Sequence, residues 1–192
     1  MMKNEAIIKS IITLLDAYNK TLSDKSNQGK RNSNSLKYLI NQSIRQYDIP
    51  SDNWHVSNAA LTLWYNLTKE DIKNYHYRDA VTCDNLKQPW NTDLFQGAYK
   101  EGDEREIFPN DSFLFNELFH EDHVIPVSLI LEEIIKSPII DYNSIKTILD
   151  KMHICVILKE EDRKLGRTKG RDLVFNKTIV DVYNKNGVEL FY

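Results

Sequence analysis

The stretch HICVILKEEDRKL, residues 153–165, constrains the fold of this chain more than any other. Its first part, residues 153–159, is short, apolar and rich in β-branched side chains, which predicts a buried strand. The following segment begins with three acidic residues, and acids at the start of a helix interact favourably with the helix dipole. This half of the chain is therefore expected to contain a strand that leads directly into a helix.

A second strand is predicted upstream, because FLFNELFHEDHVIP, residues 113–126, has a strand-like composition. It contains two histidines and two acids in succession, His120, Glu121, Asp122 and His123, a crowding of polar groups that costs stability. Side chains alternate along a strand, so His120 could share a face with Asp122. Such a costly cluster raises the possibility of a functional site.

Pairing of the two strands would bring His123 close to His153 and would place Asp162 on the helix packed across the hairpin. Asp122, His123, His153 and Asp162 could then surround one divalent cation and a water. Two acids can hold a hard ion such as Mg²⁺ while leaving positions open for phosphate and water. A histidine beside the ion can act as general base. Basic residues further along could hold a polyanionic substrate.

The N-terminal half favours helices. Apolar residues at helical spacing predict helices over residues 4–22, 35–47 and 58–67, the last capped by Ser57, and a fourth helix capped by Thr68. Residues 23–35 are expected to form a polar surface loop. Near the C-terminus, residues 172–186 favour a helix with Gly187 as C-cap, and a hairpin over NKNG is the alternative. We predict an α+β protein with a helical region, 1–83, a loop-rich connection, 84–112, and a mixed region, 113–192.

Composition excludes several classes of protein. The net charge of −3 argues against a uniformly basic nucleic-acid binder, although residues 163–177 hold six bases and one acid. Two cysteines, Cys83 and Cys155, are too few for a disulfide scaffold, so both are expected to be reduced and buried. No apolar run approaches the roughly 20 residues of a membrane span. A cytoplasmic protein without a membrane partner is expected.

The segments EDHVIP and HICVILKEEDRKL together resemble the HNH, or ββα-metal, nucleases over about residues 113–165. The resemblance implies that the region 113–192 is a ββα-metal core with helical insertions, joined to a mostly helical N-terminal region. The family's first motif reads acid, His, two apolar residues and Pro. The resemblance implies that Asp122 is a metal ligand and His123 the general base. It makes Asp162, nine residues after His153, the second metal ligand. An alignment shifted by one residue would make Glu161 that ligand instead.

The chain departs from the family pattern at several positions. His153 stands where the family usually has Asn, a position that braces the hairpin and helps orient the base, and Asp162 replaces the last His. The interval between His123 and His153 is 30 residues, longer than usual, and is expected to contain two extra helices. Zinc-binding cysteine pairs are absent. The predicted DNA contacts follow the last ligand, at Arg163, Lys164, Arg167, Lys169 and Arg171.

The sequence therefore predicts a metal-dependent endonuclease that hydrolyses DNA phosphodiester bonds with Mg²⁺, Mn²⁺ or another divalent cation. By analogy with small type II restriction endonucleases, double-stranded DNA is the expected substrate and a homodimer the expected assembly. A non-specific or toxin-type nuclease is one alternative. A catalytically silent DNA- or protein-binding module, in which Asp122 and His123 are structural, is another.

Overall fold

The computed structural model describes residues 2–75, 118–165 and 183–191, and the chain divides into two compact units. Unit 1 comprises residues Met1–Asn53 and His123–His153, and unit 2 comprises Trp54–Asp122 and Ile154–Tyr192. Each unit therefore combines a stretch from the first half of the chain with one from the second. The boundaries predicted at residues 83 and 112 lie outside the described residues.

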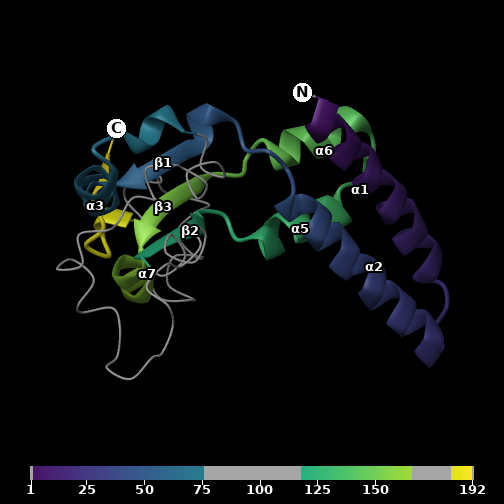
Figure 1. Ribbon diagram of the computed structural model, residues 1–192. Helices are drawn as coiled ribbons and strands as arrows, with labels where there is room; N and C mark the ends of the chain where they lie inside the picture. Colours follow the sequence, from purple (N-terminus) through teal and green to yellow (C-terminus); the bar gives the residue numbers. More distant parts are fainter. Residues whose placement is uncertain (1, 76–117, 166–182, 192) are drawn as a thin grey trace, which may run out of the picture. The chain divides into compact units, whose positions relative to one another are not determined.

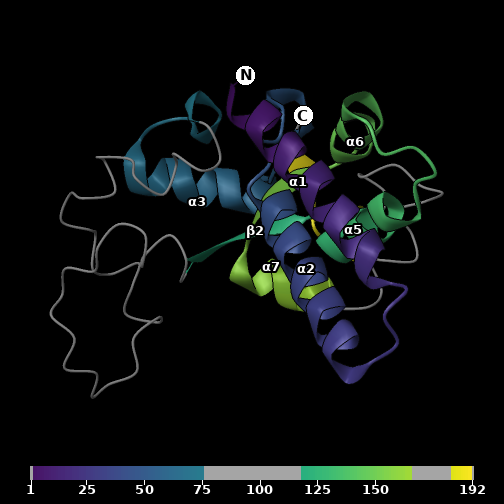
Figure 2. The same cartoon turned by 90° about the vertical axis from the view of Figure 1, so that its right-hand side faces the viewer.

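Unit 1 is built from helices packed around aliphatic side chains. The pair formed by α1 and α2 runs side by side (Figure 2), while α5 packs on α2 and α6 packs on α1. Isoleucine predominates in the core, where residues such as Ile11, Ile44 and Ile134 are fully buried. The helices are α1 (Met2–Thr21), α2 (Asn27–Arg45), α5 (Val127–Lys136) and α6 (Tyr142–Leu149).

The helix α2 begins within the segment that was predicted to be a polar loop, so the loop prediction for residues 23–35 is largely wrong. Ser26 is the N-cap, and its hydroxyl accepts a 3.0 Å hydrogen bond from the backbone N–H of Gly29. A Cβ at Gly29 would lie 2.4 Å from the carbonyl oxygen of Asp24, so the close approach requires glycine. This cap starts the helix eight residues earlier than the apolar pattern indicated.

Unit 2 contains a four-stranded mixed sheet with the strand order β2-β3-β1-β4 (Figure 1). The strands are β1 (Trp54–Ser57), β2 (Phe119–His123), β3 (Ile154–Leu158) and β4 (Leu190–Phe191). β1 pairs in parallel with β3, with Val56 opposite Val156, and pairs antiparallel with β4. The predicted neighbours β2 and β3 are confirmed. In its described part the N-terminal region is mostly helical, as predicted, but it also contributes β1, whose four residues are too few to show a period.

The parallel strands β1 and β3 each lead directly into a helix, α3 (Asn58–Thr68) and α7 (Lys159–Leu165). Ser57 caps α3 as predicted, since its hydroxyl accepts from the N–H of Ala60 at 3.1 Å. The prediction that Thr68 caps a fourth helix is wrong. Thr68 ends α3, Lys69 takes a left-handed conformation with φ 62°, and Asp71 instead caps the short 3₁₀ helix η2 (Ile72–Asn74).

The α+β class is therefore confirmed, with helices and a mixed sheet in the described residues. Gly187 has φ 74°, and its N–H donates to the carbonyl of Asn184, as expected for glycine at the end of a helical turn. Residues 172–182 of the predicted C-terminal helix lie outside the described residues. None of the described helices is both long and apolar enough to cross a membrane.

Candidate functional site

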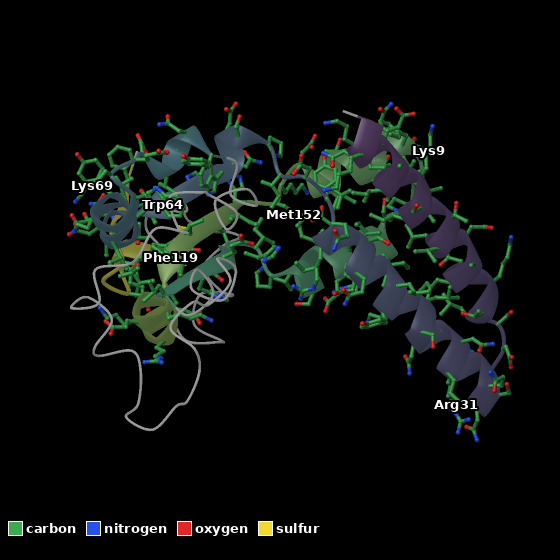
Figure 3. The ribbon with its side chains drawn as sticks, viewed as in Figure 1. Lys9, Arg31, Trp64, Lys69, Phe119 and Met152 are labelled. Carbon is green, nitrogen blue, oxygen red and sulfur yellow. The ribbon has the colours of Figure 1, made fainter. Side chains whose placement is uncertain are left out.

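Strand β2 presents two different faces. Phe119 is buried, and its ring contacts Trp64 of α3 edge to face, with 6.1 Å between the ring centroids (Figure 3). Because side chains alternate, Glu121 and His123 belong to the face of Phe119, whereas His120 and Asp122 belong to the opposite face. The anchored aromatic contact thus fixes which residues of the HEDH run lie on each side of the sheet.

Asp122 is a carboxyl group of β2 whose pKa is raised. Its Oδ2 accepts a 2.6 Å hydrogen bond from the hydroxyl of Tyr183, a residue that is only 1% exposed. Burial raises the pKa of Asp122, and the negative charge of Asp162 raises it further. The Tyr183 hydrogen bond and the charge of His120 lower that pKa, but they do not cancel the effect of burial.

The first turn of α7 brings a second carboxylate to the same face of β2. Asp162 Oδ1 lies 3.7 Å from Nε2 of His120, and both side chains are partly exposed, at 43% and 36%. Asp122 shares the face of His120, and the charge of Asp162 is the smallest of the effects that act on the pKa of Asp122. We call His120, Asp122, Asp162 and Tyr183 the acidic cluster. All four belong to unit 2.

Glu161, the alternative metal ligand, forms hydrogen bonds inside the protein and does not face the acidic cluster. It is 6% exposed, and its Oε2 accepts hydrogen bonds from the hydroxyl of Ser57 at 2.6 Å and from the N–H of Leu158 at 2.9 Å. Ser57 also caps α3, so this carboxylate ties the starts of α3 and α7 together. A carboxylate buried among fixed donors is suited to a structural role, which favours Asp162 over Glu161 as the cation ligand.

The predicted catalytic histidines lie at adjoining strand ends. The N–H of Val124, next to His123, donates to the carbonyl oxygen of His153 at 3.1 Å. Both histidine side chains are partly exposed, and burial lowers the pKa of His153. His123 lies on the face of β2 opposite Asp122. This backbone hydrogen bond brings the chain at His123 close to His153, as predicted. The roles of the two histidines in catalysis stay predictions.

The predicted DNA contacts are described only in part. Arg163 and Lys164 lie on α7 directly after Asp162, and both are exposed. The remaining three, Arg167, Lys169 and Arg171, lie outside the described residues. Cys155 is fully buried, and burial raises the pKa of its thiol well above the usual value, which argues against a nucleophilic thiolate. Cys83 is also outside the described residues.

Within the described part of the chain, no three His, Cys, Asp or Glu side chains gather in a geometry that could hold a metal ion. A cation at the acidic cluster would therefore have two carboxylate ligands, Asp122 and Asp162. This donor set suits Mg²⁺, which commonly binds through one or two carboxylates and completes its shell with water and substrate phosphate. Burial is the main cause of the raised pKa of Asp122, and a cation would stabilise the charged form of this carboxylate.

Sequence reasoning missed the part that Tyr183 plays and placed little weight on His120. Tyr183 follows Asp122 by 61 residues and carries no motif, so no local signal connects them. Strand alternation indicated that His120 could share the face of Asp122, but no role at the site was predicted for it. The chain matches no protein-family model, and comparisons with curated proteins and with solved structures find no significant match.

Proposed function

We propose that the chain is a metal-dependent endonuclease that hydrolyses DNA phosphodiester bonds at the acidic cluster. The observation that carries the proposal is the grouping of two carboxylates around His120: Asp122 shares its face of β2, and Asp162 Oδ1 lies 3.7 Å from its Nε2. Two carboxylates that repel each other at a partly exposed position are costly without a cation. The succession of β2, β3 and α7 also has the strand-strand-helix order that the HNH resemblance implies.

In this proposal Asp122 and Asp162 hold a divalent cation. The cation would neutralise charge on the scissile phosphate and on the leaving oxygen. Tyr183 fixes the orientation of Asp122, because its hydroxyl occupies Oδ2 and leaves Oδ1 for the cation. Tyr183 is buried and would only orient Asp122, whereas Asp162 is partly exposed and accessible to the cation and the substrate.

Two histidines compete for the role of general base. The resemblance assigns the role to His123, which follows Asp122 in the chain. Strand alternation favours His120, because it shares the face of Asp122 and lies 3.7 Å from Asp162. A base must lie within hydrogen-bond reach of the attacking water. We therefore propose that the general base is either His120 or His123.

The proposed substrate is duplex DNA. Arg163 and Lys164 are exposed one and two residues after Asp162, at a position where their charges could contact phosphates flanking the scissile bond. Cleavage of both strands by one site per chain would require two copies, so a homodimer is part of the proposal. The small size and the additional helical unit resemble restriction-type enzymes, and this analogy supplies the narrower proposal of a type II restriction endonuclease.

The test is an incubation of the purified protein with unmethylated and methylated plasmid DNA, in Mg²⁺ or Mn²⁺ and in EDTA. We expect cleavage with the metals and none in EDTA. Discrete fragments would support a restriction enzyme, and a smear would support the toxin-type alternative. His120→Ala and His123→Ala are compared in the same assay, and the variant that loses cleavage while keeping its fold identifies the base. Intact DNA in every lane would contradict the proposal and favour the binding module.

A further inference from the structure

Helix α2 of unit 1 has an unusual composition for an exposed helix. Its sequence, NQGKRNSNSLKYLINQSIR, contains four basic residues and no acid. Most of its remaining polar side chains are amides or hydroxyls, the groups that hydrogen-bond to base edges in DNA. Exposed helices are more often covered by acids and bases together, which form pairs along the helix. The polar side chains of α2 are thus either basic or neutral, unlike the mixed acids and bases of most exposed helices.

The apolar residues of α2 define its inner side. Gly29, Ile40 and Ile44 are buried, and the helix packs against α1 and α5. The opposite side, at helical spacing, presents Arg31, Ser35 and Tyr38, and Tyr38 is 62% exposed. Figure 3 shows Arg31 at the N-terminal end of α2, extending away from the helix. We call this side the outer face of α2.

Four bases of unit 1 lie on α2, and this helix carries no acid. Several lysines elsewhere in the unit form ion pairs with neighbouring carboxylates, as Lys9 does with Glu5 and Lys20 with Asp16. Within the described residues, Lys30, Arg31 and Lys37 have no carboxylate within ion-pairing distance. The helix thus carries three basic residues without ion-pair partners in the described part of the chain, together with amide side chains and an exposed tyrosine. Such a surface is complementary to the phosphates and base edges of DNA.

We propose that the outer face of α2 binds duplex DNA by lying in the major groove. A helix of 19 residues is roughly 28 Å long and about 10–12 Å across, which matches the groove's width of about 12 Å. Arg31 lies on the outer face, whereas Lys30 and Lys37 lie about 100–120° round the helix from it, on one flank. The two flanking lysines contact phosphates, and Arg31 with the exposed amides and hydroxyls of the outer face lies towards the base edges. The proposal rests on DNA as the substrate in the proposed function, and it adds a DNA-reading surface separate from the acidic cluster.

The test measures binding of the full-length protein to a fluorescent, mixed-sequence DNA duplex in EDTA, over a range of salt concentrations. The variant Lys30→Gln, Arg31→Gln and Lys37→Gln removes the charges and keeps good helix formers. We expect binding to weaken by roughly tenfold or more, and the slope of log affinity against log salt to fall by about three. Circular dichroism melting shows that the variant remains folded.

The matched control is Lys9→Gln, Lys20→Gln and Lys136→Gln, which removes three exposed lysines from the same unit. Each of these lysines is ion-paired on its own helix. The control should bind DNA as the wild type does, with an unchanged salt slope. Methyl green, which occupies the major groove, should displace the wild-type protein, whereas distamycin in the minor groove should not.

The two proposals fail separately. If the α2 variant and the control bind DNA equally, or if distamycin rather than methyl green displaces the protein, the assignment of α2 is overturned while cleavage can still occur. If the protein binds DNA through α2 but never cleaves it with metal, the nuclease proposal fails and the α2 surface stands. Wild-type protein that binds single-stranded RNA or acidic vesicles more tightly than duplex DNA also overturns the α2 assignment.

Discussion

The hydroxyl of Tyr183 donates a 2.6 Å hydrogen bond to Oδ2 of Asp122, which links the C-terminal segment to the last part of β2. Burial raises the pKa of both groups, so each depends on the other for a polar partner. Buried polar groups left without a partner are costly. This bond therefore connects the stability of unit 2 with the charge state of its proposed cation ligand.

Tyr183→Phe should impair both stability and activity. Loss of the hydroxyl leaves a buried carboxylate without its donor, and we expect a loss of about 1–3 kcal/mol in the free energy of unfolding at pH 7. Because this hydrogen bond lowers the pKa of Asp122, its removal should move the acidic limb of the pH–rate profile to higher pH. Tyr142→Phe, at a partly exposed tyrosine of unit 1, is the control. Equal pH profiles for the two variants would argue against the linkage.

Asp122→Asn should make the protein more stable at neutral pH. The pKa of Asp122 is raised in the folded state, so its ionisation opposes folding, and this cost is fully present above the folded pKa. The cost disappears as pH falls through that pKa towards the unfolded value, near 4. The gain of the variant over the wild type should therefore shrink between neutral and acidic pH. Thermal melting at several pH values measures it, and a constant difference would contradict the assignment.

Ser57→Ala should be among the most damaging single substitutions in unit 2. It removes the N-cap of α3 and also one of the donors to the buried carboxylate of Glu161. A lost cap costs about 1 kcal/mol, and a lost hydrogen bond to a buried charge costs about 1.5–3 kcal/mol. Urea unfolding should show a loss of about 2–4 kcal/mol. The control is Ser10→Ala, because Ser10 is exposed and its hydroxyl donates to the carbonyl of Ala6 within α1. This substitution should change stability by less than about 0.5 kcal/mol.

His153→Asn should make unfolding less sensitive to acid. Burial lowers the pKa of His153, so the folded protein favours the neutral ring. Stability is then lost as pH falls below the unfolded value of about 6.5 and continues to fall until the folded pKa is passed. Urea unfolding at pH 7.5, 6.5 and 5.5 should show a smaller loss for the variant than for the wild type. A greater acid sensitivity of the variant would show that His153 gains protons on folding.

The sequence predicted those elements whose signals are local. The strand over residues 153–159 and the acid-first helix after it are both present, because β-branched composition and a charged first turn act within a few residues. Ser57 as a cap was predictable for the same reason. The early start of α2 was not, because its first two turns are polar and are positioned by the Ser26 cap and by contact of Gly29 with Asp24.

The candidate site was predictable in part. Asp122 and Asp162 were chosen from the HNH resemblance, and the structure has both beside His120. Tyr183 could not be predicted, since a contact between residues 61 positions apart leaves no periodic trace. The strand β1 lies between β3 and β4, and its four residues depend on their neighbours in the sheet rather than on their own pattern.

The most direct test of the central claim is the rate of plasmid cleavage by Asp122→Asn at saturating Mg²⁺. It is compared with that of Asp16→Asn, which alters an exposed aspartate on α1 that pairs with Lys20. The account predicts cleavage at least about 100-fold slower for Asp122→Asn, with its fold intact, and a wild-type rate for Asp16→Asn. Equal rates for the two variants would show that Asp122 holds no catalytic cation, and would contradict the account.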